Sequence, residues 1–294
     1  MERGAFMLPV QVGCSYNKCR FCMLFKHLEF RVLPVEQIEN ELKRVKNAGG
    51  SPSSVFLGDG NAFVLGFERL VDILDLIHSY FPDCGKINMD ATVRSIEALS
   101  EEELAILHRR GVSRLYIGIE SGLEDVLSFM NKGNTLEEAR VQIARLRNAG
   151  IDYAAHIMTG VAGKGRGYEN AKATAAFLNE TRPVSVTNFS MFTEKQSPLW
   201  ASVEDGSFVP ATVLEAMEEE YCLIENLDIP IKYEGFQDFI EVRTSGTLPR
   251  DRSRMLEKLG KVIEEYRTKP AIYACIDVEP GICACTCKES CYRP

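Results

Sequence analysis

Residues 54–91 read SVFLGDGNAFVLGFERLVDILDLIHSYFPDCGKINMDA and contain one complete strand–helix–strand unit. The apolar run at 54–57 predicts a buried strand, which Gly58-Asp59-Gly60 ends. Pro82 closes the helix that follows, and residues 87–91 predict the next strand. The apolar positions of that helix recur at the spacing of one helical face: Leu70, Ile73, Leu74 and Ile77.

The same alternation of short apolar runs and amphipathic helices extends from residue 8 to about 190. Further strands are expected at 8–13, 114–119, 153–159 and 184–190. Helices are expected after Pro34, which suits a first helical position, and at two capping boxes, Ser100 with Glu103 and Thr135 with Glu138. Six β-α repeats predict parallel strands joined by right-handed crossovers, which leaves either a doubly wound sheet or a partial barrel.

In both architectures the chemistry gathers at the C-terminal ends of the strands. Residues that are reactive, charged or able to expose the backbone stand at these ends: Cys14, Gly58-Asp59-Gly60, Arg94, Glu120, Ser121 and Gly160 to Gly163. This concentration on one rim favours an enzyme. After residue 200 the rhythm changes to a helix at 211–226, an irregular stretch through Gly246, a helix at 250–266 and a cysteine tail.

The composition is that of an ordinary globular protein, with 45% hydrophobic and 26% charged residues among 294. Because 34 basic and 42 acidic side chains give a net charge of −8, nucleic acid is an unlikely partner. No apolar run approaches the roughly 18 residues of a membrane span, and the first residues lack the pattern of a secretory signal. We therefore expect a cytoplasmic protein.

Three of the ten cysteines, Cys14, Cys19 and Cys22, lie together just after the first strand with the spacing C-x4-C-x2-C. In a reducing compartment, closely spaced thiols indicate metal binding or catalysis rather than disulfides. Three thiolates suit a four-iron cluster and leave one iron open to an outside molecule. The alternative is a zinc loop, which needs a fourth ligand such as His27 or a distant cysteine.

The stretch Gly13-Cys14-Ser15-Tyr16-Asn17-Lys18-Cys19-Arg20-Phe21-Cys22 resembles the radical S-adenosylmethionine (SAM) superfamily, although the typical motif, C-x3-C-x-aromatic-C, has one residue fewer between the first two cysteines. Further blocks resemble an uncharacterised subgroup of that superfamily, which is distantly similar to oxygen-independent coproporphyrinogen oxidases. These blocks are residues 55–62, 116–122, 130–133 and 246–251. The resemblance implies a partial (β/α)6 TIM-like barrel over residues 1–200, followed by a mostly helical extension with a Cys-rich tail over 201–294.

By this resemblance, Cys14, Cys19 and Cys22 hold a [4Fe-4S] cluster whose open iron chelates SAM. One electron then cleaves SAM to methionine and a 5′-deoxyadenosyl radical, which abstracts hydrogen from a small-molecule or peptide substrate. The electron comes from a donor such as flavodoxin or ferredoxin. The implied role of Phe21 is to pack near the adenine, and ordinary core packing is the alternative.

The resemblance also assigns residues to the other parts of SAM. Gly58, Asp59 and Gly60 face the methionine amino group, unless they form a plain turn. Arg94 pairs with the carboxylate, unless it is a surface charge. Glu120 and Ser121 bind the ribose hydroxyls, although Glu120 could instead cap the next helix. The segment that begins at Gly160 runs past the adenine. Its Lys164 does not indicate a P-loop, because Gly165 stands where Walker-type magnesium binding requires Ser or Thr.

Four more cysteines form the pattern C-x-C-x-C-x3-C near the end of the chain: Cys283, Cys285, Cys287 and Cys291. They predict a second iron–sulfur cluster, a zinc site, or a redox-active or flexible tail. A function of another class also remains open, namely a non-catalytic Cys-rich iron–sulfur or zinc-binding redox carrier. Cys84 and Cys222 have no cysteine neighbours in the sequence and are expected to be buried small hydrophobes. His156 is interpreted as a core histidine with its hydrogen bonds satisfied.

Overall fold

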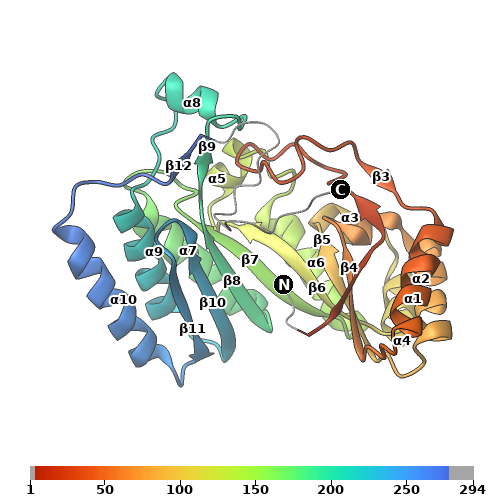
Figure 1. Cartoon of the computed structure of the whole chain (residues 1–294). Coiled ribbons are helices and arrows are strands. Elements are labelled where there is room, and N and C mark those ends of the chain that lie inside the picture. Colours follow the sequence, from red (N-terminus) through yellow and green to blue (C-terminus); the bar gives the residue numbers. More distant parts are fainter. Residues whose placement is uncertain (1–3, 278–294) are drawn as a thin grey trace.

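The computed structural model describes residues 4–277, which build one curved eight-stranded sheet with helices along its outer side (Figure 1). The strands lie in the order β1 (Phe6–Pro9), β4 (Ser54–Gly58), β5 (Lys86–Ala91), β6 (Val112–Glu120), β7 (Asp152–Thr159), β8 (Ser185–Ser190), β10 (Ile231–Gln237) and β11 (Val242–Leu248). Every pair is parallel except β10 with β11. Since β1 and β11 are the two edges, the described sheet forms a partial barrel.

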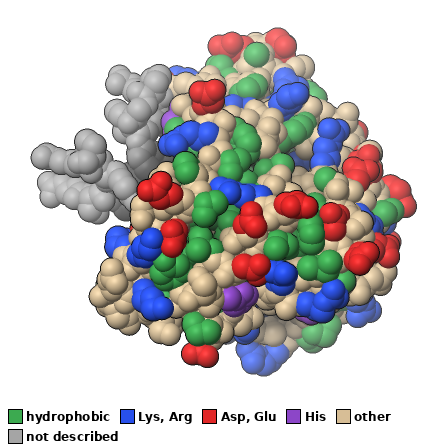
Figure 2. Space-filling model, turned by 90° about the vertical axis from the view of Figure 1, so that its right-hand side faces the viewer, with side chains coloured by type: hydrophobic (Ala, Val, Ile, Leu, Met, Phe, Trp, Pro, Cys, Tyr) green, Lys and Arg blue, Asp and Glu red, His purple; other side chains and the backbone are tan. Residues whose placement is uncertain are grey.

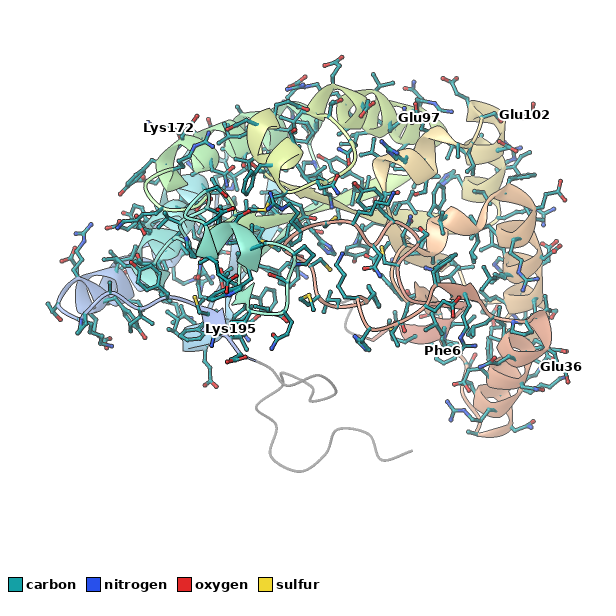
Figure 3. All side chains as sticks on the ribbon, turned by 90° about the horizontal axis from the view of Figure 1, so that it is seen from above. Phe6, Glu36, Glu97, Glu102, Lys172 and Lys195 are labelled. Atoms are coloured by element: carbon teal, nitrogen blue, oxygen red, sulfur yellow. The ribbon has the colours of Figure 1, made fainter. Side chains whose placement is uncertain are left out.

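The helices follow the strands in chain order, as parallel crossovers require. They are α1 (Val35–Asn47), α2 (Phe67–Tyr80), α3 (Val93–Glu97), α4 (Glu101–Arg109), α5 (Glu124–Phe129), α6 (Leu136–Ala149), α7 (Gly167–Thr181), α8 (Trp200–Glu204), α9 (Val213–Asn226) and α10 (Arg252–Arg267). Seen from above, they trace an arc, and Glu36, Glu97, Glu102 and Lys172 lie at its outer rim (Figure 3).

Both expected capping boxes are confirmed, at Ser100 with Glu103 and at Thr135 with Glu138. Each Ser or Thr side chain accepts from the backbone N–H three residues on, and each Glu accepts from the N–H of the capping residue. The boxes at Thr92 and Thr212 were not predicted, and the first of these begins α3, a short helix that the sequence analysis missed.

The apolar stripe of α2 faces the sheet. Leu70, Ile73, Leu74 and Ile77 are all 0% exposed, and burial of each contributes roughly 1.5–3 kcal/mol relative to leaving it in water. Cys84 and Cys222 are likewise buried, which confirms their interpretation as small hydrophobes.

The first strand differs from the prediction of one strand over 8–13. β1 starts earlier, at Phe6, and ends at Pro9, which has no N–H to offer a neighbouring strand. The chain then turns away, and β2 (Gln11–Val12) pairs with β3 (Arg31–Val32) in a small separate sheet. Pro34 is the residue before the first turn of α1 rather than its first helical residue.

Helices α9 and α10 confirm the helical part of the predicted extension, but the stretch through Gly246 is not irregular as predicted. It forms the β10–β11 hairpin, and β10 continues the large sheet by pairing in parallel with β8. The buried residues of β10 alternate with charged ones, as in Ile231, Lys232, Tyr233 and Glu234, so no apolar run marks the strand. The sheet therefore crosses residue 200, and the division into 1–200 and 201–294 stays a prediction.

Short elements complete the described chain: the 3-10 turns η1 (Ala62–Leu65) and η2 (Asp238–Ile240), and the pair β9 (Thr193–Glu194) with β12 (Cys275–Ile276). Between residues 4 and 277, no helix combines the length and the apolar character needed to cross a membrane. Acidic and basic side chains are intermixed on the side of the molecule that Figure 2 shows.

Candidate functional site

The three N-terminal cysteines lie in one loop at the C-terminal end of β1. The loop is closed at its base by the β2–β3 pair, in which Val12 lies opposite Arg31. Inside it, the Asn17 side-chain amide donates to the Phe25 carbonyl at 2.9 Å, so the chain folds back on itself. Cys14, Cys19 and Cys22 are all partly exposed, which leaves the thiols accessible from the rim of the barrel.

The block after α5 clamps this loop in place. The Arg20 amide donates to the Met130 carbonyl at 3.0 Å. Asn131 accepts at its carbonyl from the Tyr16 hydroxyl at 2.7 Å and donates from its amide to the Lys18 carbonyl at 3.1 Å. A Cβ on Gly133 would lie only 2.6 Å from the Tyr16 ring, so glycine is required at this contact. Residues 130–133 thus fix the cysteine loop, which explains why they stand out as a block.

A buried ion pair joins the end of β6 to the same block. Lys132 Nζ lies 2.7 Å from Glu120 Oε1, with 12% and 11% of the two side chains exposed. A Cβ on Gly118 would meet both partners, at 2.3 Å from Glu120 Oε1 and 2.6 Å from Lys132 Nζ. Glu120 does not cap α5, which begins after Leu123 with no side-chain cap. In the sequence, Lys132 is marked only as part of the 130–133 block, and no local pattern identifies it as a site residue.

The surroundings of the thiols shift their pKa values in opposite directions. Burial raises the pKa of the Cys19 thiol to about 11, and the ammonium of Lys132 opposes that increase. Burial also raises the pKa of Cys22, and the nearby Cys14 thiol adds to the effect. Because metal ligands must be thiolates, cluster binding has to displace these protons, and the positive charge of Lys132 assists their loss.

A four-iron cluster takes each of three thiolates on a different iron, whereas zinc gathers its ligands around one ion. Within residues 4–277, no group of three or more His, Cys, Asp or Glu side chains is arranged to hold a single metal ion.

The Gly58-Asp59-Gly60 segment ends β4 directly beside the cysteine loop. The Gln11 side chain donates to the Asp59 carbonyl at 2.5 Å. Gly60 adopts φ +56°, and a Cβ there would lie 2.7 Å from the Gly13 carbonyl oxygen. The carboxylate of Asp59 is exposed at this edge, so a ligand's ammonium group can reach it.

Arg94 lies in the first turn of α3, and its guanidinium donates to the Gly133 carbonyl. With Tyr16, Lys132 and Asn61 it lines a cavity of about 290 Å³ beside the cysteine loop. Arg94 is exposed, and its bond to Gly133 holds the guanidinium at the rim. The cavity has two cations in its wall.

The segments expected to contact adenosine lie further along the same rim. Phe21 packs against a buried apolar cluster that contains Val161, Met191 and Leu199. Gly160, at φ +83°, starts the loop after β7. The Ser121 hydroxyl follows β6 and donates to Asn170 on α7. The structure thus brings every described candidate residue to one edge of the sheet, while Cys283, Cys285, Cys287 and Cys291 lie outside the described residues.

His156 belongs to a row of rings on the inner face of the sheet. Its ring centroid lies 5.5 Å from that of Tyr116 and 5.6 Å from that of Phe189. Burial lowers the pKa of His156 to about 4, so the ring is neutral. Its Nε2 is buried without a hydrogen-bond partner in the described part of the chain. His156 therefore lies in the core as predicted, but its hydrogen bonds are not all satisfied there.

Two neighbouring carboxyls of α9 lie behind this rim, with Glu219 2% and Glu220 0% exposed. Glu219 accepts from the Gly160 amide and the Asn170 side chain, and Glu220 accepts from Gln237 and the Tyr233 hydroxyl. Burial raises the pKa of Glu219 to about 8 and that of Glu220 to about 7.

These raised pKa values predict a stability that falls as the pH rises. Between about pH 5 and pH 7, an unfolded chain releases the Glu220 proton, which the folded chain keeps, so unfolding becomes easier with increasing pH. The contribution of Glu220 is on the order of 2–3 kcal/mol over that range. Glu220→Gln removes it. The free energy of unfolding of this variant, measured by denaturant titration at each pH, should lack this part of the decline, and an unchanged slope would contradict the assignment.

Comparison with known proteins finds three kinds of likeness. The family model of the radical SAM superfamily matches residues 8–178. A tRNA-2-methylthio-N(6)-dimethylallyladenosine synthase of Chlorobium phaeobacteroides is 24% identical over 180 residues, which are 60% of this chain and 39% of that protein. The heme chaperone HemW of Bacillus subtilis is 24% identical over 140 residues, which are 46% of this chain and 37% of that protein.

Among solved structures, coproporphyrinogen III oxidase (HemN) of Escherichia coli has a similar fold, with a TM-score of 0.60 and 17% identity. The match covers 77% of this chain and 53% of that chain. This likeness confirms the mixed α/β, parallel-dominated fold. The chain spans well under half the length of the two curated relatives, so what those proteins act on is not carried over with the likeness.

Proposed function

Because the chain belongs to the radical SAM superfamily, we propose that it is an enzyme that cleaves SAM reductively at a [4Fe-4S] cluster and abstracts hydrogen from a substrate. One observation carries this proposal: the loop of Cys14, Cys19 and Cys22 is clamped at the same strand edge as the Gly58, Glu120 and Gly160 segments. A carrier protein would need only the cysteine loop. When bound, the cluster supplies one electron to the sulfonium of SAM, which releases methionine and a 5′-deoxyadenosyl radical.

The methionine part of SAM would meet charges of both signs. Asp59, beside the cysteine loop, accepts hydrogen bonds from the ammonium group. Lys132 and Arg94 border the cavity next to the loop and attract the carboxylate. Lys132 also lies close enough to Cys19 to influence the pKa of that thiol. We therefore assign Lys132 as the cation that binds the carboxylate of SAM beside the cluster.

The adenosine part would extend along the rim away from the cysteines. Glu120 and Ser121 end β6, where a carboxylate and a hydroxyl suit the two ribose hydroxyls. Phe21 and the backbone after Gly160 border an apolar cluster suited to adenine. The ion pair with Lys132 orients Glu120, which leaves its second oxygen for the ribose.

The test is anaerobic reconstitution with iron and sulfide, followed by reduction with dithionite in the presence of SAM. We expect 5′-deoxyadenosine and methionine in equal amounts, measured by liquid chromatography and mass spectrometry. If a fully iron-loaded chain forms no 5′-deoxyadenosine, the enzyme proposal fails and the redox-carrier function remains. Deuterium transfer from a candidate molecule into 5′-deoxyadenosine would identify the substrate, and a flavodoxin or ferredoxin replaces dithionite as the proposed physiological donor.

The C-terminal cysteines are proposed to hold a separate metal, either a second iron–sulfur cluster or zinc. If so, Cys285→Ala lowers the metal content per chain but leaves cleavage of SAM at the N-terminal loop. Metal analysis and the 5′-deoxyadenosine assay on the same sample check this prediction. Loss of cleavage at full N-terminal iron loading would show that the two sites are not independent.

A further inference from the structure

Glu219 connects helix α9 to the loop that follows β7. Its Oε2 accepts from the backbone amide of Gly160 at 2.8 Å, and its Oε1 accepts from Asn170 Nδ2 at 2.6 Å. Both oxygens therefore receive N–H donors. No Lys or Arg forms an ion pair with Glu219 within residues 4–277. In this part of the chain, the two hydrogen bonds therefore offset the free-energy cost of removing the carboxyl group from water.

Asn170 continues the chain of contacts to the end of β6. Its Oδ1 accepts from the Ser121 hydroxyl and, at 3.4 Å, from Thr174 Oγ1. The Thr174 hydroxyl in turn accepts from the Gly122 amide at 2.8 Å. One continuous network thus runs from the segment after β6, through α7, to the loop after β7.

The packing around this network is close. A Cβ on Gly122 would lie 2.3 Å from the Ala173 carbonyl carbon, and one on Gly167 would lie 3.1 Å from the Glu219 Cβ. A small cavity of about 10 Å³ lies between Glu120, Asn170 and Glu219. With so little free space, the carboxyl cannot change its partners without moving one of the two segments.

We propose that Glu219 is a positioning residue that, together with Asn170, fixes the spacing between the Ser121 segment and the Gly160 loop and so sets the affinity for SAM. The inference rests on the proposed function, because only there do these two segments hold the ribose and the adenine of one molecule. It places a determinant of SAM binding on α9, outside the 8–178 region that matches the superfamily. Each oxygen of the Glu219 side chain already receives one N–H donor, which suits a residue that must hold a backbone amide.

The hydrogen-bond polarity of the network gives a direct test. Glu219→Gln keeps the shape but turns one acceptor into a donor, which then faces either the Gly160 amide or the Asn170 amide. Asn170→Asp alone sets two carboxyls against each other. In the double variant Asn170→Asp/Glu219→Gln, the new amide at position 219 accepts from Gly160 and donates to the new carboxylate at position 170. Every described bond of Glu219 and of Asn170 Oδ1 then has a counterpart.

The measurements use the iron-loaded chain and two readouts. For Glu219→Gln we expect a dissociation constant for SAM about tenfold higher, which is the effect of one lost hydrogen bond. We also expect faster amide hydrogen exchange at residues 158–165, with or without SAM. The double variant should return both values to near those of the wild type. If Glu219→Gln does not fold, the double variant must still fold and bind.

Glu220→Gln is the matched control, because Glu220 is the next residue on α9 and equally buried but bonds to Gln237 and Tyr233 instead. It should leave the affinity for SAM unchanged. Equal weakening in Glu220→Gln and Glu219→Gln, unchanged binding in Glu219→Gln, or no recovery in the double variant would each overturn the inference. A wild-type chain that is iron-loaded but neither binds nor cleaves SAM would instead overturn the proposed function.

Discussion

Cys19→Ala should abolish the formation of 5′-deoxyadenosine. Cys19 is one of three thiols in a loop that the 130–133 block holds at the strand edge. Two remaining thiolates cannot occupy three irons of a cluster, so we expect loss of the cluster and of its visible absorbance as well as loss of cleavage. The assay for 5′-deoxyadenosine and an iron and sulfide determination on the same preparation measure both.

Cys84→Ala is the matched control for this substitution. It also removes one thiol, but Cys84 is buried against α2 and lies outside the cysteine loop. This variant should retain its cluster and its cleavage activity, with at most a lower stability. Retention of a full cluster in Cys19→Ala, or equal loss in both variants, would refute the assignment of Cys19 as a ligand.

Lys132→Met should cause the next largest loss. The substitution keeps an apolar stem of similar length but leaves the Glu120 carboxylate buried without its cation. Removal of one partner of a buried pair costs about 3–5 kcal/mol, so the unfolding temperature should fall. Loss of the cation beside Cys19 also makes the site more negative. The cluster should then be harder to reduce, which a shift of its midpoint potential to more negative values would show.

The double variant Glu120→Gln/Lys132→Met separates the two effects. It removes both charges and should recover most of the lost stability. Because Glu120 is also assigned to the ribose, the KM for SAM of the double variant is compared with that of the single variant Glu120→Gln. We expect the KM of the double variant to be the higher one, because the cation that meets the carboxylate of SAM is missing as well. Equal KM values in these two variants would contradict the role proposed for Lys132.

The fold could be predicted largely from local patterns. The α2 stripe and the capping boxes at Ser100 and Thr135 depend on residues within one or two turns of each other, and the structure contains all of them. The β10–β11 hairpin escaped prediction because its charged residues face the inner side of a sheet that only the tertiary fold creates. Lys232 lies in a strand because β10 pairs with β8, which comes nearly fifty residues earlier in the chain.

The candidate site likewise has features that local sequence predicts and features that depend on the tertiary fold. Cysteine spacing is a local signal, so the loop of Cys14, Cys19 and Cys22 was identifiable. Its clamp is not local, because Tyr16 and Asn131 come together only through the fold. Glu219 carried no signal at all, since a glutamate on a helix with other acidic residues is typical of a solvated face. Its burial and its bond to Gly160 are visible only in three dimensions.

We propose that three thiolates at this strand edge hold a four-iron cluster with one iron open to SAM. Mössbauer spectroscopy of the ⁵⁷Fe-loaded chain tests it most directly, because the method distinguishes the irons by their ligands. We expect one iron of the four to have its own signal, which shifts when SAM is added and does not form in Cys19→Ala. A spectrum that SAM leaves unchanged in a fully loaded wild-type chain would contradict it.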